Sequence, residues 1–283
     1  MNRRQRESLY FTMFRACGAL VVLALVVIIG YMLIGGAGAI SWDFLTQPPK
    51  RSNTEGGILT PLVGTLYLMA ITFVFAIPVG ILSAVYLVEY QRPGRVSSFW
   101  RIVVANLAGV PSIVYGLLGL GLFVYALGFG RSLLASGLTL GVLVLPVVIA
   151  ASREAIQAVP PSVRQAALAL GATKWQTVRH HVLPYAMPGI LTGVILSLSR
   201  AAGETAPILL TGVAFYMSGM PDSLFSQFMA LPYHIYSVAT QTVSGMSGSP
   251  MVYGSALVLL ALVIGMNVVA IVIRKKYREK YRW

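Results

Sequence analysis

An arginine and a glutamate lie one helical turn apart within a long apolar run. Small and polar residues continue the same spacing of three and four positions: Gly193, Ser197, Arg200, Glu204, Pro207 and Thr211. In a helix, this spacing places all six on one face. An arginine at the centre of a membrane-spanning helix costs about 2.5–3.5 kcal/mol on insertion scales. The sequence therefore predicts that Arg200 has a partner or a function.

Two interpretations of this pair stay open. In one, Arg200 and Glu204 form a structural ion pair that locks neighbouring helices. In the other, the planar fork of donors on Arg200 binds an oxyanion in transit. Glu204 then keeps the site from holding the anion too tightly, or accepts a proton from it. Phosphate still carries protons at neutral pH and sulfate carries none, so this interpretation favours phosphate.

Further polar residues are expected along the same pathway. Ser197 lies one turn before Arg200, and Thr205 follows Glu204 directly. Asn106 belongs to another apolar run, which Pro111, Ser112 and Tyr115 also make polar enough to line the pathway. The predicted pathway residues are Arg200, Glu204, Ser197, Thr205 and Asn106.

A polar, basic segment, residues 158–184, lies between two apolar runs and carries two helix-start signals. Ser162 with Gln165 matches a capping box, and Thr173 with Gln176 matches another. The residues expected to end or block a helix are Pro160, Pro161, Gly171 and Pro184. The segment is therefore predicted to form two short helices at an angle, outside the membrane, suited to fit a groove on another protein.

The composition is that of a membrane protein. The chain is 57% hydrophobic and only 10% charged, with a mean hydropathy of +0.78, whereas soluble domains are about 25% charged. Several apolar stretches approach the length of about 20 residues that crosses a bilayer. The predicted spans are 17–38, 62–88, 102–127, 133–155, 185–213 and 252–273. The first run is longer than the core of a signal peptide, about 7–15 residues, and is expected to be a true span.

The net charge of +13 reports topology rather than a nucleic-acid partner. With six spans and Met1 inside, the whole basic excess falls on the cytoplasmic side, while acidic and basic residues balance on the outer side. This distribution is the one the positive-inside rule describes. Both termini are therefore expected to be cytoplasmic, with 40–60 and 214–251 outside. The aromatic 214–251 segment suits a helix that lies at the interface or dips back inward, or a plain interfacial loop.

Signatures of catalysis and of metal binding are missing from the sequence. No G-x-x-x-x-G-K-[ST] loop is present, so this chain is not expected to hydrolyse ATP in that way. The single cysteine, Cys17, forms no disulfide framework. The three histidines lack ligand neighbours and are expected to be ordinary surface residues: His180, His181 and His234. Glycines within the apolar runs favour close helix packing; they are Gly116, Gly119, Gly121, Gly137, Gly141, Gly189 and Gly193.

The 158–184 segment resembles the "EAA" coupling loop of ABC importer permeases. That loop has Glu-Ala-Ala, three residues, Gly, and an apolar residue with Leu-Pro further on. This chain has Gln165-Ala166-Ala167, then Gly171 and Leu183-Pro184, so a glutamine stands where the pattern has glutamate. The string from Arg200 to Pro207 resembles the Arg-Ala-x-Gly-Glu-Thr-Ala-Pro motif of PstA-type permeases of phosphate importers. Further matches lie at 64–67, 109–116 and 230–236.

This resemblance implies the partners and the roles of the site residues. A PstA-type permease would pair with a PstC-type permease, two copies of a separate ATPase and an extracytoplasmic phosphate-binding protein. ATP would be bound by the ATPase, with no cofactor in this chain. The residues that would couple to the ATPase are Gln165, Ala166, Ala167, Gly171, Lys174 and Trp175.

The predicted fold is an all-α integral membrane protein of six transmembrane helices, with the architecture of a type I (MetI-like) ABC importer permease. Residues 1–60 would hold the N-terminal tail, the first span and an outer loop. Residues 61–275 would form the permease domain, and 276–283 a basic cytoplasmic tail. The predicted function is phosphate import through the inner (plasma) membrane, without catalysis by this subunit. The alternatives are a sulfate or molybdate permease of the same architecture, and a self-sufficient anion channel or ion-coupled carrier.

Overall fold

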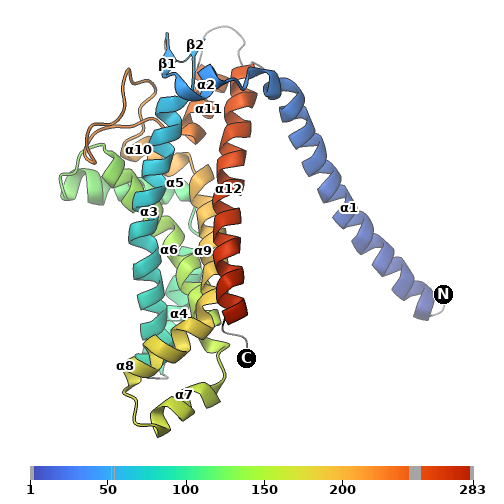
Figure 1. Cartoon of the computed structure of the whole chain (residues 1–283), viewed down its shortest axis with the longest axis vertical. Coiled ribbons are helices and arrows are strands. Elements are labelled where there is room, and N and C mark those ends of the chain that lie inside the picture. Colours follow the sequence, from blue (N-terminus) through green and yellow to red (C-terminus); the bar gives the residue numbers. More distant parts are fainter. Residues whose placement is uncertain (1–2, 52, 54, 93, 242–249, 281–283) are drawn as a thin grey trace.

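The computed structural model is an elongated helical bundle from which one long helix stands apart (Figure 1). It describes the chain except for residues 1–2, 52, 54, 93, 242–249 and 281–283. The helices up to the bend in the third span are α1 Arg3–Gly36, η1 Ala37–Ala39, α2 Trp42–Thr46, α3 Leu59–Val85, η2 Tyr86–Tyr90 and α4 Arg95–Leu107. The others are α5 Ser112–Gly119, η3 Leu120–Ala126, α6 Leu133–Gln157, α7 Pro161–Ala169, α8 Lys174–Thr177, η4 Val178–Val182, α9 Leu183–Gly203, α10 Ala206–Thr211, α11 Leu231–Gln241 and α12 Pro250–Lys280.

Within the described residues, five helices are long and apolar enough to cross a membrane, and a sixth crossing is possible as a bent pair. The bent pair consists of α4 together with α5 and η3, which meet at an angle of 103°. The span predicted over 102–127 thus corresponds to this bent pair, and it begins earlier, at Arg95. The bend contains Gly109 and Pro111, and a proline disfavours the helical conformation in the residue before it. α4 consequently ends at Leu107, and a new helix begins at Ser112.

The core lies where α3, α6 and α9 pack together. Glycines allow these helices to approach closely, as predicted. A Cβ added at Gly137 would lie 2.5 Å from Ile71 on α3, and one added at Gly193 would lie 2.3 Å from Ala151 on α6. Hydrogen bonds join the same elements, since the hydroxyl of Thr72 donates to the carbonyl of Gly137 at 3.2 Å. These three helices thus form the rigid frame on which the shorter elements are placed.

The fifth span begins earlier and ends earlier than predicted. α8 continues through the π-helical turn η4 into α9, so one helical run extends over 174–203 and Pro184 does not block it. A π-helical turn lets a helix continue past a residue, such as proline, that cannot donate a backbone hydrogen bond. At the other end, Glu204 has an extended conformation (φ −74°, ψ 128°). Pro207 cannot donate to the carbonyl of Gly203, which is where α9 ends.

The predicted helical face over 193–211 is therefore divided between two helices. Gly193, Ser197 and Arg200 lie on α9, whereas Pro207 and Thr211 lie on α10. α10 is fastened to α6, because the hydroxyls of Thr211 and Ser136 are 2.9 Å apart and both side chains are buried. Thr211 consequently serves packing rather than an open pathway.

The outer segments have more structure than loops. Residues 40–60 contain α2 and a two-stranded antiparallel hairpin, β1 Pro49–Lys50 and β2 Glu55–Gly56. In the segment predicted to lie outside, residues 228–231 are buried, and the backbone N–H of Leu231 donates to the hydroxyl of Thr65 on α3 at 2.8 Å. Of the interpretations of 214–251, a helix is seen over Leu231–Gln241, as α11, and it packs back onto the bundle. The stretch 242–249 lies outside the described residues.

The prediction that His234 is a surface residue was wrong. On α11, its side chain is only 1% exposed, and neither ring nitrogen has a hydrogen-bond partner among the described residues. Burial lowers the pKa of His234 to about 4. The reason is that α11 packs back onto the bundle, which composition alone did not reveal. His180 and His181 are exposed on η4, as predicted.

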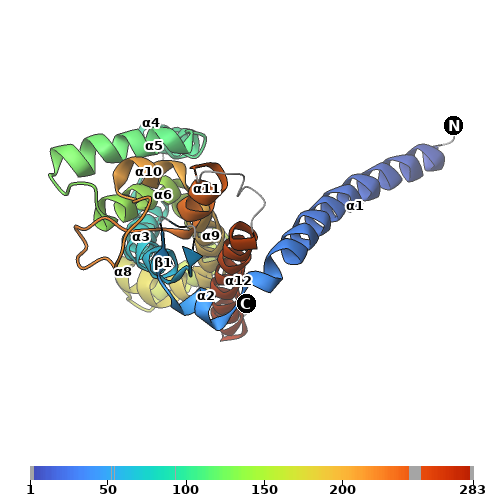
Figure 2. The same cartoon turned by 90° about the horizontal axis from the view of Figure 1, so that it is seen from above.

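α1 leans away from the bundle in both views (Figures 1 and 2). None of the residues in its most apolar window is buried. Its C-terminal end meets α12, where a Cβ added at Gly36 would lie 2.6 Å from the backbone of Tyr253. The rings of Tyr31 and Tyr253 meet edge to face with centroids 5.5 Å apart. α1 is thus held at one end, with an apolar surface along the rest of its length.

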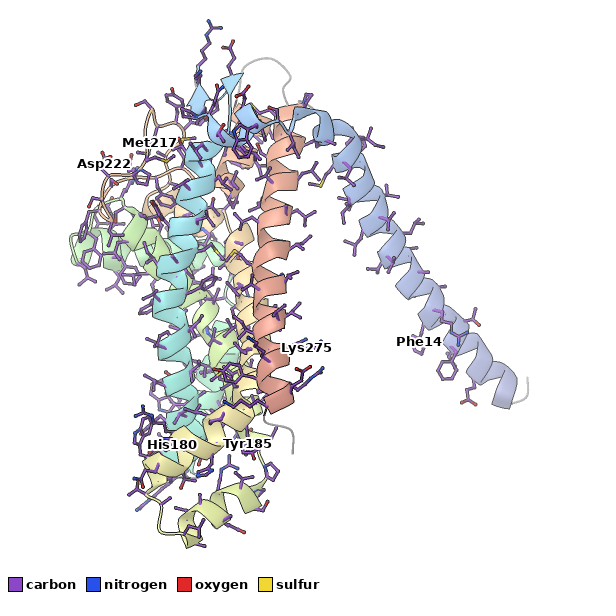
Figure 3. The ribbon with its side chains drawn as sticks, in the orientation of Figure 1. Phe14, His180, Tyr185, Met217, Asp222 and Lys275 are labelled. Carbon is purple, nitrogen blue, oxygen red and sulfur yellow. The ribbon has the colours of Figure 1, made fainter. Side chains whose placement is uncertain are left out.

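The two ends of the bundle differ in their residues (Figure 3). Met217 and Asp222 lie at the end that carries the hairpin, whereas His180, Tyr185 and Lys275 lie toward the opposite end. The first described turn of α1 and the last turn of α12 also point toward this second end (Figure 1).

Candidate functional site

Arg200 and Glu204 form an ion pair at the break between α9 and α10. Nε of Arg200 lies 3.3 Å from Oε1 of Glu204. The two side chains are 38% and 17% exposed, respectively, so the guanidinium is open on the surface of this single chain. Because Glu204 has left the helix, its carboxylate reaches back to the last turn of α9. The charged pair is therefore positioned by a helix end rather than by a continuous helical face.

The other predicted pathway residues are distributed around this break. Ser197 is buried, and its hydroxyl donates to the carbonyl of Gly193 at 2.9 Å. Thr205 is half-buried at the start of α10 and makes no side-chain capping bond. Asn106 is exposed near the end of α4, on the other side of the bend from α5. The structure thus keeps Glu204 in contact with Arg200, places Thr205 at the start of α10, and leaves Ser197 occupied within its own helix.

Tyr115 on α5 belongs to the same neighbourhood. It lies close enough to Arg200 to interact with its charge, and its hydroxyl donates to the carbonyl of Leu107 at 2.8 Å. This bond spans the bend, since Leu107 is the last residue of α4. α5 is packed against α10 at Gly116, where an added Cβ would lie 3.0 Å from Pro207. The bend in the third span is therefore tied to the surroundings of Arg200.

The 158–184 segment projects from the opposite end of the bundle as α7 followed by α8 (Figure 1). α7 ends in a Schellman motif, with the N–H of Ala172 donating to Ala167 at 3.1 Å and that of Gly171 donating to Leu168 at 3.0 Å. Gly171 has φ +82°, as predicted for the residue that ends this helix. The motif turns the chain sharply into α8.

α8 begins with the predicted capping box. The N–H of Gln176 donates to the hydroxyl of Thr173 at 3.3 Å, and the N–H of Thr173 donates to Oε1 of Gln176 at 2.8 Å. The other predicted box, at Ser162, was wrong, because α7 begins directly at Pro161 without a side-chain cap. Proline is well suited to the first helical position, since its missing N–H would have no partner there.

The side chains of the coupling segment fall into two groups. Gln165, Ala166 and Trp175 are exposed, and so are Leu168 and Leu170, the latter at 90%. Ala167 is buried and packs α7 onto the bundle. Lys174 is exposed, with its ammonium 5.1 Å from the centre of the Tyr90 ring. Exposed apolar residues on a projecting segment, here Leu168, Leu170 and Trp175, are typical of a surface that binds a protein partner.

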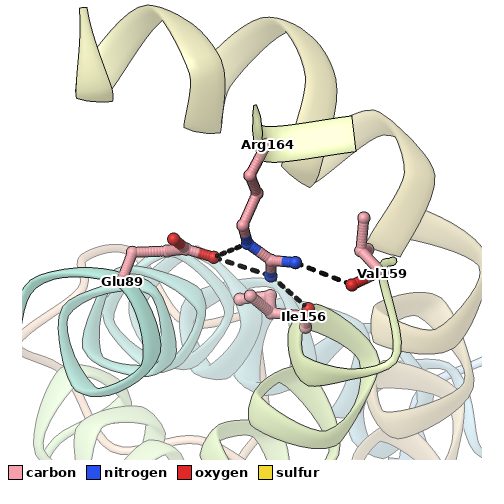
Figure 4. Close-up of polar contacts among 4 residues, drawn as sticks. All are labelled: Glu89, Ile156, Val159 and Arg164. Atoms are coloured by element: carbon pink, nitrogen blue, oxygen red, sulfur yellow. Dashed lines mark hydrogen bonds and ion pairs between the residues drawn. The ribbon is translucent and has the colours of Figure 1, made fainter. Parts of the chain in front are cut away.

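One residue of this segment was missed as a functional candidate. Arg164 donates from Nε and Nη2 to Oε1 of Glu89, at 2.9 and 2.8 Å (Figure 4). Its Nη1 also donates to the carbonyl of Val159 at 2.6 Å, and Nη2 to that of Ile156 at 2.8 Å. Arg164 thereby joins α7 to η2 and to the carboxyl end of α6. The sequence contains no signal for this contact, because it shows only two distant residues of opposite charge, both in segments predicted to be cytoplasmic.

The comparisons with known proteins fall on one family. Residues 76–282 match the model of the binding-protein-dependent transport system inner membrane component. The chain belongs to this family. A curated relative, the "Phosphate transport system permease protein PstA 1" of Mycobacterium tuberculosis (strain CDC 1551 / Oshkosh), is 36% identical over 278 residues, which cover 97% of this chain and 90% of the relative. The resemblance drawn from the Arg200 to Pro207 string is confirmed by this relative.

Two solved structures share the fold of this inner membrane component. One is an inward-facing conformation of the MetNI methionine ABC transporter, with a TM-score of 0.60, 19% identity, and coverage of 78% of this chain and 97% of that one. The other is a bacterial ABC transporter involved in the import of the acidic polysaccharide alginate, with a TM-score of 0.63, 14% identity, and coverage of 97% and 99%. The predicted MetI-like importer architecture is confirmed.

Membership of the family also shows which subunit hydrolyses ATP. An inner membrane component of this kind is a non-catalytic membrane subunit, and ATP hydrolysis is done by a partner ATPase. The coupling segment and the Arg200 neighbourhood lie at opposite ends of α9, which runs between them as one helical element with α8 and η4. One continuous helical run therefore connects the 158–184 segment to Arg200.

Proposed function

We propose that this chain is the membrane-spanning permease subunit of an ATP-driven inorganic phosphate importer. The observation that carries the proposal is the Arg200/Glu204 pair, held on an open face where α9 breaks and α10 begins. The guanidinium offers two-pronged donation to an oxyanion, and the carboxylate accepts a proton from a protonated one. The name of the mycobacterial relative supports phosphate as that anion.

The exposed position of Arg200 favours a pathway shared with a second permease. A guanidinium facing lipid is costly, so a charged face of this bundle needs a partner or water. We propose that a PstC-type permease supplies the opposite wall in a heterodimer. The apolar, unburied surface of α1 also suits a second permease or lipid.

The remaining partners follow from the two ends of the bundle. We propose that two ATPase subunits bind the permease pair at the coupling segments, where Gln165, Leu170 and Trp175 are exposed. An extracytoplasmic phosphate-binding protein would bind the end that carries the hairpin and residues 214–231. Both termini would then be cytoplasmic, in agreement with the charge distribution along the chain.

Uptake by the reconstituted transporter tests the proposal. The permease pair, the ATPase and the binding protein are placed in proteoliposomes, and uptake of radioactive phosphate and of sulfate is measured with and without ATP. The expected result is phosphate uptake that requires ATP and the binding protein. Preferential sulfate or molybdate uptake would assign the chain to the alternative anion. Uptake without ATP or partners would indicate a self-sufficient channel or carrier.

A further inference from the structure

A small polar cavity lies between η2, the beginning of α4 and the end of α6, on the predicted cytoplasmic side and away from both sites described above. Its volume is about 180 Å³, and its lining residues are Leu87, Gln91, Ser97, Arg101, Arg153 and Gln157. Two guanidinium groups, a hydroxyl and two amides thus face one space without a carboxylate among them. A cavity of this composition attracts an anion.

Two buried polar atoms in this cavity are unpaired. Nε of Arg153 and Oε1 of Gln91 have no hydrogen-bond partner among the described residues. Buried polar groups are nearly always hydrogen-bonded, and those that are not call for an explanation. One of these atoms is a donor on a cation and the other is an acceptor. A ligand that satisfies both carries a negative charge and a hydroxyl group.

The nearby carboxylates do not neutralise the cavity. Glu89 is committed to Arg164. Glu154 lines the adjoining groove together with Arg101 and Arg153, but it forms no ion pair with either arginine among the described residues, and one carboxylate against two guanidinium groups leaves the region positively charged. Arg101 donates from Nη2 to the hydroxyl of Ser98 at 3.2 Å, and this acceptor is neutral. Among the described residues, Arg101 forms no ion pair that would balance its positive charge.

Two apolar grooves adjoin the polar cavity along α4. One, of about 420 Å³, shares Leu87, Arg101 and Arg153 with the cavity and continues between α4 and α6 past Val104 and Pro146. The other, of about 560 Å³, runs between α3 and α4 and is also lined by Leu87 and Val104. A free phosphate ion would occupy the polar cavity alone. A molecule with a charged head and two apolar chains would fill all three.

We propose that this site binds an anionic phospholipid of the cytoplasmic leaflet. Arg101 and Arg153 hold the phosphodiester, Gln91 accepts a hydrogen bond from a headgroup hydroxyl, and the acyl chains lie along the two grooves beside Val104. Basic pockets between membrane helices on the cytoplasmic side are known places for such headgroups. The bound lipid fixes α4 against α3 and α6 and so sets the position of the bent third span.

The test uses the complete transporter, purified in detergent and stripped of lipid. Dioleoylphosphatidylglycerol and dioleoylphosphatidylcholine are titrated separately, and binding is measured by native mass spectrometry and by the midpoint of thermal unfolding. We expect phosphatidylglycerol to bind and to raise the midpoint, with phosphatidylcholine much weaker. The double variant R101Q/R153Q is expected to bind phosphatidylglycerol about thirtyfold more weakly, from the loss of two basic contacts.

Two further variants test whether the lipid binds at this cavity and its grooves rather than to basic residues in general. R92Q/R95Q removes the same charge from exposed positions that do not line the cavity, and is expected to bind phosphatidylglycerol like the unmodified protein. Val104→Trp fills the apolar grooves without changing charge, and is expected to weaken phosphatidylglycerol binding as well. It also keeps the proposal testable if R101Q/R153Q fails to assemble.

Several outcomes would overturn the proposal. Equal losses in R101Q/R153Q and R92Q/R95Q would mean a general charge effect. Inorganic phosphate that stabilises the unmodified protein and competes with the lipid, together with unchanged binding in Val104→Trp, would identify a free-anion site. Absence of phosphatidylglycerol binding to the assembled transporter would show that a partner subunit covers the grooves.

Discussion

Arg164 and Glu89 lie 75 positions apart in the sequence and meet where α7 joins the bundle. The guanidinium makes two contacts with one carboxylate oxygen, one with the carbonyl of Ile156 in the last turn of α6, and one with the carbonyl of Val159 just beyond that helix. A cation at the carboxyl end of a helix is favourable because the unpaired carbonyls carry partial negative charge. Movement of α7 is therefore passed to α3 and α6 together, through one side chain.

Removal of Arg164 should uncouple the transporter. Arg164→Ala leaves Glu89, only 9% exposed, without its partner, and should destabilise the α7 junction by about 2–4 kcal/mol, between the exposed and the fully buried cases. We expect ATP hydrolysis to continue while phosphate uptake per ATP falls. Arg164→Lys should be intermediate, since one ammonium cannot reproduce the fork.

The control for this change is Arg95→Ala, an exposed arginine at the same end of the bundle. It should leave the ratio of uptake to hydrolysis unchanged. If Arg164→Ala assembles normally and keeps that ratio, the junction is not part of transmission.

Substitutions at Gly171 test the turn between α7 and α8, and they distinguish backbone strain from steric crowding. A Cβ at this position meets nothing within 4 Å, so only the positive φ opposes a side chain. Gly171→Val should cost about 1–2 kcal/mol locally and should uncouple ATP hydrolysis from uptake. Gly171→Asn, which tolerates this conformation, should remain close to normal. Similar behaviour of the two variants would contradict a role for the Schellman turn.

A double substitution distinguishes the structural interpretation of the Arg200/Glu204 pair from the anion-binding one. If the pair is structural, neutralising both residues restores what the single change loses. If Arg200 contacts the anion, Arg200→Gln and Arg200→Gln/Glu204→Gln should both lose uptake by about tenfold to a hundredfold, the value of one charge-assisted contact. Arg200→Lys should also be impaired. Near-normal uptake by the double variant, at matched expression, would assign the pair to structure.

The matched control for these changes is Arg274→Gln on α12. Arg274 is half-buried, and its Nη1 donates to the hydroxyl of Thr192 on α9 at 3.2 Å in an exposed contact. Its contact is at Thr192, within α9, rather than at the break after Gly203. Its loss should leave uptake within a few-fold of normal, because its contact with α9 is exposed and such contacts contribute little.

His234 predicts a dependence of stability on pH. Its pKa is about 4 in the folded protein and about 6.5 when unfolded, so the unfolded state binds the proton more readily. Stability should be complete above about pH 6.5 and should fall as the pH drops toward 4, by up to about 3 kcal/mol. Thermal unfolding from pH 7.5 to 4.5 measures this loss. His234→Leu should flatten the profile, and an unchanged slope would contradict the assignment.

The orientation of the bundle can be tested by labelling. After the exposed native Cys17 is changed to serine, single cysteines are placed at Gln165 and Asp222, which are both exposed and lie at opposite ends. An impermeant thiol reagent should label position 222 in intact cells and position 165 only after the membrane is opened. The reverse pattern would invert the topology.

Features decided by neighbours in the sequence were predictable. The Thr173/Gln176 box and the Gly171 turn each depend on a few consecutive residues, and both were confirmed. The apolar runs and the glycines within them were also predictable, because length and small size are local properties. The break after Gly203 could have been found as well, since Pro207 interrupts the spacing that suggested one continuous face.

Other features depend on residues that are distant in the sequence. Nothing near Arg164 indicates Glu89, since the pair forms only when the end of α3 meets α7. His234 was misjudged because burial of α11 depends on how residues 228–231 pack beside Thr65. The exposure of Arg200 also could not be read from spacing, because it is set by the side of the bundle that α9 faces.

The attachment of α1 has a consequence for biosynthesis. Its anchoring surface, at Tyr253 and Gly254, belongs to the last helix of the chain. At about 5–20 residues per second, the ribosome needs roughly ten seconds or more to reach α12 after α1 has emerged. During this interval, α1 lacks α12, the helix that anchors it, and its apolar surface allows it to lie in lipid instead. The N-terminal helix is thus the first to enter the membrane and among the last to reach its final position.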